Sequence, residues 1–403
     1  MKPWIIHIGS GQWQQQAIIA MKQRGYKNLA VDGNPHAAGF VHADDTLVTD
    51  ILNPSLTLHT VINYCLLHKI VPNAIFSIAN EVGQVSAATL RQHFALAGVH
   101  AELAMKLTNK ALQRQLYQGQ RFSPHYQVFD TNLLDRLIPS HFPDGFLQQK
   151  LIVKPVDASG SRGITIVAPS EINELRQAAE YASHCSRTKK IIVEQFIEGQ
   201  EYTLESVIIE GRTHPLLITK KVQGNCGTVS RMLMTAELPN LTKQAIYDTV
   251  ANAHRLLQYE NGISHAEIIV DNNKQVWIVE VAGRGAGWAV SEKFIEFATG
   301  YHYFDASLAF NLGERIEIPS SIQPSSCCIR FFETQSGELI ELSIPQIEGV
   351  YGEQILLKGA KMHDAKTDND RIGFAMLKAN CNKQLIEKLD HIEAQTQVVL
   401  KTN

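Results

Sequence analysis

The sequence predicts an α/β and α+β chain of several domains, and three observations support this prediction. A strand, a helix and a second strand open the chain, the sequence changes in character near Leu103, and short strands alternate with turns from Ile318 onward. The 403 residues, 44% of them hydrophobic, suffice for a large core or for two to three domains. We therefore expect a doubly wound N-terminal unit followed by β-rich domains.

Composition argues against several classes of protein. The 37 Lys and Arg residues nearly balance the 40 Asp and Glu residues, so charge gives no reason to expect nucleic acid or an anionic membrane as a partner. The six cysteines show no C-x-x-C pair and no metal-ligand spacing, as is typical of a reduced protein. The N-terminus has no signal-peptide pattern, and no apolar run reaches about twenty residues. We therefore expect a cytoplasmic protein without a membrane span.

The start of the chain has the pattern of a Rossmann-like unit. Residues 4–8 are a predicted buried strand, Gly9-Ser10-Gly11 and a helical pattern follow, and a second strand ends at Asp32. The glycines and Asp32 fit part of a dinucleotide-binding fingerprint, but Gln14 stands where that motif has its third glycine. A tight turn is therefore a better interpretation than an NAD site.

Further elements continue this domain. Strands are expected at 45–48 and 74–78, with a helix at 56–68 between them. Glu81 follows the last of these strands, at the carboxyl edge where open α/β sheets bind ligands.

A loop rich in glycine and serine follows the predicted strand 151–153. This strand presents Lys154, and the loop 157–163 comes directly after it. Backbone N–H groups freed by glycine can cradle phosphate oxygens, and serine side chains add donors. The loop lacks the ending of a Walker A motif, and an ordinary hairpin turn is the alternative. With Lys154 beside it, we interpret the loop as a flexible lid over phosphate.

The connector after strand 191–193 holds two carboxylates, Glu194 and Glu201, seven residues apart. Such a connector can place Glu194 and backbone groups against an adenine edge, while Glu201 accepts hydrogen bonds from ribose hydroxyls. The alternative is a solvated hairpin between two strands.

A second pair of carboxylates lies on two predicted strands joined by the turn 271–273. The stretch 275–288 delivers Glu280 at a strand end and then turns through glycines around Arg284, which offers a metal ligand and a cation. Glu267 precedes the turn by roughly as much as Glu280 follows it, so both carboxylates can lie at one sheet end. Mg²⁺ would relieve their repulsion. The alternatives are a surface turn and two exposed strand acids.

The order of these motifs resembles the ATP-grasp superfamily over nearly the whole chain. The motifs are Lys110 near a helix start, Lys154 with its loop, the run Glu194–Glu201, the run His265-Ala266-Glu267, and the run Glu280–Arg284. Within that superfamily the chain resembles the carboxylate–amine ligases of the L-amino acid ligase type, on the run 262–267, the Arg284 turn and the C-terminal segment.

The resemblance implies an ATP-grasp fold in which ATP lies between two β-rich lobes. By similarity the chain divides into a Rossmann-like domain (1–103), a small lobe (104–198), a large lobe (199–318) and a C-terminal β-rich subdomain (319–403). The last segment would close the back of the ATP site. Its expected elements are strands at 327–332, 355–357 and 371–378 and a helix at 383–395 with Leu385, Ile386, Leu389 and Ile392 on one face.

The resemblance also assigns residues to ATP and metal. Glu267 and Glu280 would bind Mg²⁺, with Mn²⁺ as an alternative. The phosphates of ATP would contact two lysines and the glycine- and serine-rich loop, namely Lys110, Lys154, Ser159, Gly160, Ser161 and Gly163. Adenine and ribose would contact the connector, namely Glu194, Gln195, Ile197 and Glu201.

On the substrate side, Arg284 would hold a carboxylate or an acyl phosphate, because its planar fork binds oxyanions with two hydrogen bonds. Lys220, Lys221 and the loop 223–227 would form a wall, with one of the two lysines facing the site. For His265, a substrate role and a hydrogen-bonded structural role both stay open.

The implied reaction transfers a phosphoryl group from ATP to a substrate carboxylate, giving an acyl phosphate that an amine then attacks. The expected substrates are small carboxylates and amines such as amino acids, and dimers are frequent among such enzymes. Ala282 departs from the family pattern, which has an asparagine there as a further metal ligand. Two alternatives stay open: a bicarbonate-activating enzyme similar to biotin carboxylase or carbamoyl-phosphate synthase, and a nucleotide-binding module that has lost catalysis.

Overall fold

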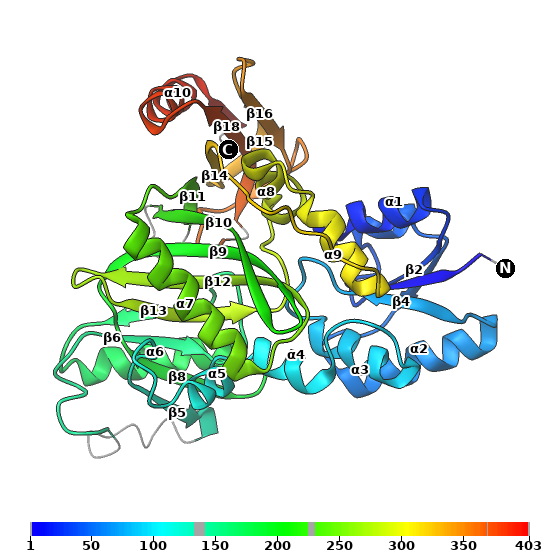
Figure 1. The fold of residues 1–403 in the computed structure, drawn as a ribbon, viewed down its shortest axis with the longest axis horizontal. Coiled ribbons are helices and arrows are strands. Elements are labelled where there is room, and N and C mark those ends of the chain that lie inside the picture. Colours follow the sequence, from blue (N-terminus) through cyan, green and yellow to red (C-terminus); the bar gives the residue numbers. More distant parts are fainter. Residues whose placement is uncertain (1, 133–141, 225–229, 369, 402–403) are drawn as a thin grey trace.

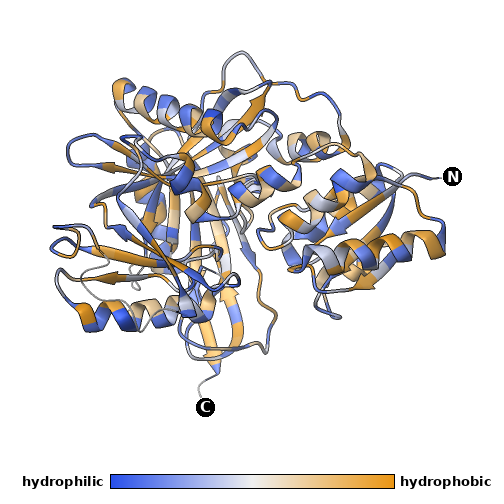
Figure 2. Ribbon diagram, turned by 90° about the horizontal axis from the view of Figure 1, so that it is seen from below, coloured by the Kyte–Doolittle hydropathy of each residue, from blue (hydrophilic) through white to orange (hydrophobic). Residues whose placement is uncertain are grey.

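The computed structural model describes residues 2–132, 142–224, 230–368 and 370–401. Figure 1 shows an N-terminal domain beside a larger body, in which a small lobe faces a long sheet that continues into the C-terminal strands. In Figure 2 the helices show hydrophilic and hydrophobic bands, as expected where one face of a helix packs on a sheet.

The N-terminal domain confirms the predicted doubly wound unit. Its parallel sheet has the order β3-β2-β1-β4, and Ile5 packs on one face of this sheet while Ile6 and Ile8 pack on the other. The predicted strand at 74–78 ends earlier, at Phe76. The strands are β1 (Trp4–Ile8), β2 (Lys27–Asp32), β3 (Asp45–Val48) and β4 (Pro72–Phe76). The helices are α1 (Gln15–Gln23), α2 (Pro54–His68), α3 (Gln84–Phe94) and α4 (Ala101–Leu107), with 3-10 turns at Gln12–Gln14 and Ala38–His42.

The small lobe is an antiparallel sheet of order β5-β8-β6-β7 with one face covered by α6. Before it lies α5, which begins where the Asn109 side chain accepts hydrogen bonds from two backbone N–H groups of the first turn. The elements are α5 (Lys110–Leu116), β5 (Tyr126–Asp130), β6 (Leu151–Pro155), β7 (Thr165–Val167), α6 (Ile172–Cys185) and β8 (Lys190–Gln195).

The large sheet has the order β13-β12-β9-β10-β11-β14-β18-β16. Helix α7 lies across β12 and β13 in Figure 1, and its apolar residues Ile246, Val250 and Leu257 join their core. The first part comprises β9 (Gly199–Ile209), β10 (Arg212–Gln223), β11 (Ser230–Thr235), α7 (Asn240–Leu257), β12 (Gly262–Asp271) and β13 (Val276–Ala282). A π-helical turn (Val290–Phe294), α8 (Ile295–Thr299) and α9 (Tyr303–Leu312) follow, and α9 packs against β4 of the N-terminal domain.

The C-terminal segment extends this large sheet and adds a small sheet of order β17-β15-β19. Its elements are β14 (Ser326–Glu333), β15 (Gly337–Ser343), β16 (Val350–Gln354), β17 (Lys361–Met362), β18 (Arg371–Ala379), α10 (Asn382–Gln395) and β19 (Gln397–Lys401). The division of the chain at residue 319 therefore separates strands that share one sheet, and the four-domain division stays a prediction.

Two predictions for this segment are wrong. The strand expected at 355–357 lies earlier, at Val350–Gln354, because Ile355 and Leu356 both donate their backbone N–H to the Ile372 carbonyl and so leave the regular pairing. On α10, Leu385, Leu389 and Ile392 are buried as predicted, but Ile386 is 48% exposed. Ile386 lies one residue beyond the buried stripe, where the helix has already turned toward solvent.

The connector between β8 and β9 joins two different sheets, because β8 belongs to the small lobe and β9 to the large sheet. The hairpin alternative for residues 194–203 is therefore wrong. By contrast, β6 and β7 do pair as a hairpin, and the loop 157–163 connects them. Across the described ranges, no helix combines the length and the apolar character that crossing a membrane requires.

Candidate active site

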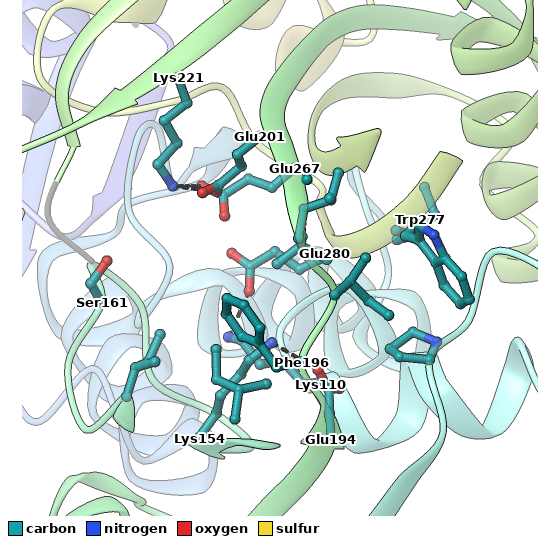
Figure 3. Close-up of a pocket in the computed structure, with 18 of the residues that line it drawn as sticks. Lys110, Lys154, Ser161, Glu194, Phe196, Glu201, Lys221, Glu267, Trp277 and Glu280 are labelled. Carbon is teal, nitrogen blue, oxygen red and sulfur yellow. Dashed lines mark hydrogen bonds and ion pairs between the residues drawn. The ribbon is translucent and has the colours of Figure 1, made fainter. Parts of the chain in front are cut away.

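A cavity of about 440 Å³ lies between the small lobe and the large sheet. Figure 3 shows Glu201, Glu267 and Glu280 pointing toward one another, with Lys221 on one side of them and Lys110, Lys154 and Glu194 on the other. Most of the predicted site residues line it: Lys110, Lys154, Ser159, Gly160, Ser161, Glu194, Gln195, Ile197, Glu201, Lys220, Lys221, Glu267 and Glu280. Gly163 and Arg284 do not border it.

Glu267 and Glu280 are direct partners across the β12–β13 ladder. The Asp271 side chain closes the turn by accepting hydrogen bonds from the backbone N–H of Asn273 and Gln275 at 2.9 Å. A register shift between Glu267 and Ile268 then brings Glu280, rather than Val279, opposite Glu267. The two acids are 23% and 19% exposed. The expectation that a hairpin would place both carboxylates together is confirmed.

Lys110, the first residue of α5, forms an ion pair at 2.6 Å with Glu280 of β13. Its Nζ also donates to the Ala158 carbonyl at 2.8 Å, at the start of the glycine- and serine-rich loop. Burial favours the neutral carboxyl, but the Lys110 charge outweighs that effect and lowers the pKa of Glu280. Glu280 is therefore ionised at neutral pH.

Lys154 belongs to a buried ionic triad. The Glu194 carboxylate accepts hydrogen bonds from Lys154 Nζ and Arg114 Nε, both at 2.7 Å. Despite burial, these two cations lower the pKa of Glu194 to about 2. Arg114 also donates to the Val279 carbonyl at 2.9 Å, so the triad connects the small lobe, α5 and β13. Both oxygens of Glu194 thus already have cationic partners.

Lys221 links the remaining acids of the large sheet. Its Nζ lies 2.6 Å from a Glu201 oxygen and 3.3 Å from a Glu267 oxygen. Burial would lower the pKa of Lys221, but the two carboxylates raise it overall. Lys220, its neighbour on β10, is exposed, as expected from the alternation of side chains along a strand.

His265 lies between two carboxylates at the edge of this network. Its Nδ1 is 2.5 Å from a Glu205 oxygen, and its Nε2 is 3.6 Å from a Glu267 oxygen. Burial opposes the charged imidazole, but Glu205 and Glu267 raise the pKa of His265 to about 10. Because it does not border the cavity, its contacts favour the structural role over the substrate role.

Arg284 follows β13 and contacts the N-terminal domain. Its Nε lies 2.5 Å from a Glu81 oxygen, and its NH1 donates to the Gly285 carbonyl at 3.1 Å. Both side chains are only 13% exposed. Glu81 and Arg284 were each singled out at a sheet edge, and the fold brings them together.

The N-terminal glycine turn has the features of a tight turn rather than of a dinucleotide site. The Asp32 carboxylate accepts hydrogen bonds from the backbone N–H groups of Ser10 and Asn34. Gln14, in the place of the third glycine, donates to the Ile78 carbonyl at 2.9 Å and fills the space beside the turn.

Sequence reasoning missed several residues of the cavity wall. Arg114 lies one helical turn after Lys110, and this spacing could have marked it. Trp277 lies on the same strand as Glu280, and the apolar pattern of that strand did not mark it as part of the cavity wall. Asp368, which lies in a turn of the C-terminal segment, carried no local signal. Part of the predicted substrate wall, residues 225–227, lies outside the described residues.

Comparison with known proteins supports the class that this geometry suggests. Residues 147–292 match the ATP-grasp domain, a range that runs from before β6 to the π-helical turn and includes Glu194, Glu201, Glu205, Glu267 and Glu280. The chain therefore carries an ATP-grasp domain and has the ATP-grasp fold, as the motif order implied.

Particular relatives are similar over parts of the chain. Alanine–anticapsin ligase of Bacillus subtilis is 25% identical over 158 residues, which cover 34% of each chain. The formate-dependent phosphoribosylglycinamide formyltransferase of Francisella tularensis subsp. novicida is 29% identical over 212 residues, 50% of each. The chain thus spans half or less of the length of these relatives. The structure of L-amino acid ligase from Bacillus licheniformis has a TM-score of 0.79 at 19% identity and covers 100% of this chain and 99% of its own.

Proposed function

We propose that this protein is an ATP- and Mg²⁺-dependent ligase that joins a small carboxylate, such as an amino acid, to an amine. The observation that carries the proposal is the register pair Glu267 and Glu280, which lines one cavity together with Lys110 and Lys154. Two carboxylates opposite two lysines suit a triphosphate with a divalent cation.

The acids of β12 and β13 suit Mg²⁺. Glu267 and Glu280 are held ionised because neighbouring cations lower the pKa of each, against the effect of burial. Hard oxygen donors of this kind are the ligands that Mg²⁺ prefers, and Mn²⁺ accepts the same set. When bound, the ion would neutralise charge on the transferring phosphoryl group. Ala282 offers no side-chain ligand, so we assign these two glutamates as the protein ligands.

The lysines and the loop would hold the phosphates. Lys154 is oriented by Glu194, whose oxygens are taken up by Lys154 and Arg114. We therefore assign Glu194 to positioning Lys154, and the adenine edge to the neighbouring backbone of Gln195 and Ile197. Glu201, opposite this backbone on β9, would accept hydrogen bonds from ribose, with Lys221 as its counter-charge.

The reaction that follows needs no side-chain nucleophile. A substrate carboxylate oxygen attacks the γ-phosphorus of ATP and ADP leaves, giving an acyl phosphate. An amine then attacks the acyl carbon and phosphate leaves, so that a C–N bond forms. Arg284 does not border the cavity and pairs with Glu81, so it would hold the carboxylate or the acyl phosphate only if the substrate replaced Glu81 as the partner of its guanidinium fork. The names of the partial relatives, an amino acid ligase and a formyltransferase, fit carboxylate activation.

The test is ADP release measured with ATP, Mg²⁺ and a panel of single and paired amino acids. We expect release that requires a carboxylate substrate and rises when a second amino acid supplies the amine. Stimulation by bicarbonate alone would favour the alternative of a bicarbonate-activating enzyme. Nucleotide binding without any substrate-stimulated release over a broad panel would contradict ligase activity and favour a module that has lost catalysis, the alternative motivated by Ala282.

A further inference from the structure

The glycine- and serine-rich loop rests on a turn of the C-terminal segment, far away in the sequence. Ser161 Oγ donates a hydrogen bond to Asp368 Oδ2 at 2.9 Å, and the Asp368 backbone N–H approaches the Gly160 carbonyl at 3.4 Å. All three residues line the cavity. A side-chain contact and a backbone contact therefore join the same two segments.

The loop conformation at this point needs external support. Gly160 and Ser161 have φ values of +67° and +60°, two consecutive residues in the left-handed region. Glycine adopts this region freely, but serine does so at a cost and needs surrounding contacts to hold it there. The hydrogen bond from Ser161 to Asp368 is such a contact.

Asp368 itself is fixed to the core of the large sheet. Arg371 NH2 donates to Asp368 Oδ1 at 2.7 Å, and Arg371 is only 4% exposed. The Arg371 guanidinium carbon lies 3.8 Å from the centre of the Phe331 ring on β14 and 5.3 Å from the Trp288 ring. The carboxylate is therefore held between a buried cation and the loop.

We infer that Asp368 is a positioning residue that seats the phosphate loop over the cavity, so that the C-terminal segment sets how well the loop holds a nucleotide. Ser161 is the contact on the loop, and Arg371 is the anchor in the core. The part of this inference that concerns nucleotide rests on the proposed function. The part that concerns the loop position does not.

The loop position can be measured without any substrate. Arg162 is exposed within the loop, next to Ser161, and offers a trypsin site there. We expect trypsin to cleave after Arg162 about tenfold faster in Asp368→Ala than in the wild type, because a hydrogen bond to a charged group is lost. Asp364→Asn removes the same charge from the same segment, yet Asp364 contacts Ser336 rather than the loop, so this variant should cleave at the wild-type rate.

Asp368→Asn keeps an acceptor for Ser161, so its rate of cleavage should fall between the rates of the wild type and Asp368→Ala. This variant also allows the test if Asp368→Ala folds poorly. Cleavage of both Asp368 variants at the wild-type rate would overturn the inference. So would equal acceleration in Asp364→Asn, which would indicate general loosening of the segment.

Steady-state kinetics of ADP release provide a second test. Asp368→Ala should raise KM for ATP about tenfold and change kcat little, because the loop is displaced while the groups that act on the phosphates remain. A loss confined to kcat would contradict the role of seating the nucleotide. If the wild type releases no ADP with any substrate, the proposed function fails, while the trypsin comparison still decides the position of the loop.

Discussion

The two sides of the cavity hold their charges in different ways. On the small-lobe side, Glu194 is 1% exposed and has two cationic partners, Arg114 and Lys154, so its charge is matched within the protein. On the large-sheet side, Glu267 and Glu280 are partly exposed, and their counter-charges Lys221 and Lys110 reach them from neighbouring elements. The first set is a fixed support. Under the proposed function the second set would be exchangeable: a cation would replace the lysines as the partner of the glutamates, and the lysines would then pair with the phosphates.

The largest expected effect concerns the large-sheet side, where Glu267 and Glu280 form the exchangeable set. Glu280→Ala should lower turnover by at least about 100-fold, because it removes one of two acids assigned to the cation. Its cost in the free energy of unfolding should be only about 1 kcal/mol, since the ion pair with Lys110 is partly exposed. Steady-state ADP release and urea denaturation measure the two quantities.

Glu341→Ala, an exposed acid on β15, is the matched control and should leave both quantities unchanged. Full activity in Glu280→Ala would mean that the cation site lies elsewhere.

The second prediction tests the fixed side. Glu194→Ala should lower the free energy of unfolding by about 3 to 5 kcal/mol, because Arg114 and Lys154 would be left as buried charges without their shared partner. Urea denaturation measures this loss, and Glu280→Ala provides the comparison. Similar losses in the two variants would break the distinction between a support and an exchangeable set.

The last prediction concerns the dependence of stability on pH, for which the two sides of the cavity should show opposite trends. The pKa of Glu194 is about 2, against an ordinary 4.5, so its contribution is complete above pH 4.5 and is lost as the pH falls toward 2. The contribution of Glu194 to the free energy of unfolding that depends on pH is about 3 kcal/mol at most. The pKa of His265, on the large sheet, is about 10, against an ordinary 6.5, so its contribution is complete below pH 6.5 and is lost as the pH rises toward 10.

Denaturation midpoints measured across pH should show this. Glu194→Gln should flatten the acid side of the stability profile, and His265→Gln should flatten the alkaline side. A variant that shifts the whole profile without changing its slope would contradict the assignment of that group.

The sequence predicted those site residues that local structure delivers. Lys154 lies near the end of a strand, Lys110 begins a capped helix, and Glu267 and Glu280 lie on one hairpin closed by a short turn, where a register shift makes them direct partners. Such positions depend on a few neighbouring residues, so pattern and spacing suffice to find them.

The partners of these residues could not be predicted in the same way. Glu81 meets Arg284 and Ser161 meets Asp368 only because separate domains and sheets pack together. Ile386 shows that local pattern can also mislead. Helical spacing predicted that it lies on the buried face of α10, but it is exposed. Which face of an element is covered depends on the tertiary structure.

The continuity of the large sheet limits how the protein can be shortened. β11 pairs with β10 on one side and with β14 on the other, and β14 comes from the C-terminal segment. A fragment reduced to the matched residues 147–292 would expose β11 as an unpaired edge and uncover apolar side chains such as Met232 and Leu233. Open, apolar edges pair with other chains. We expect such a fragment to aggregate, so expression work should keep residues 319–403.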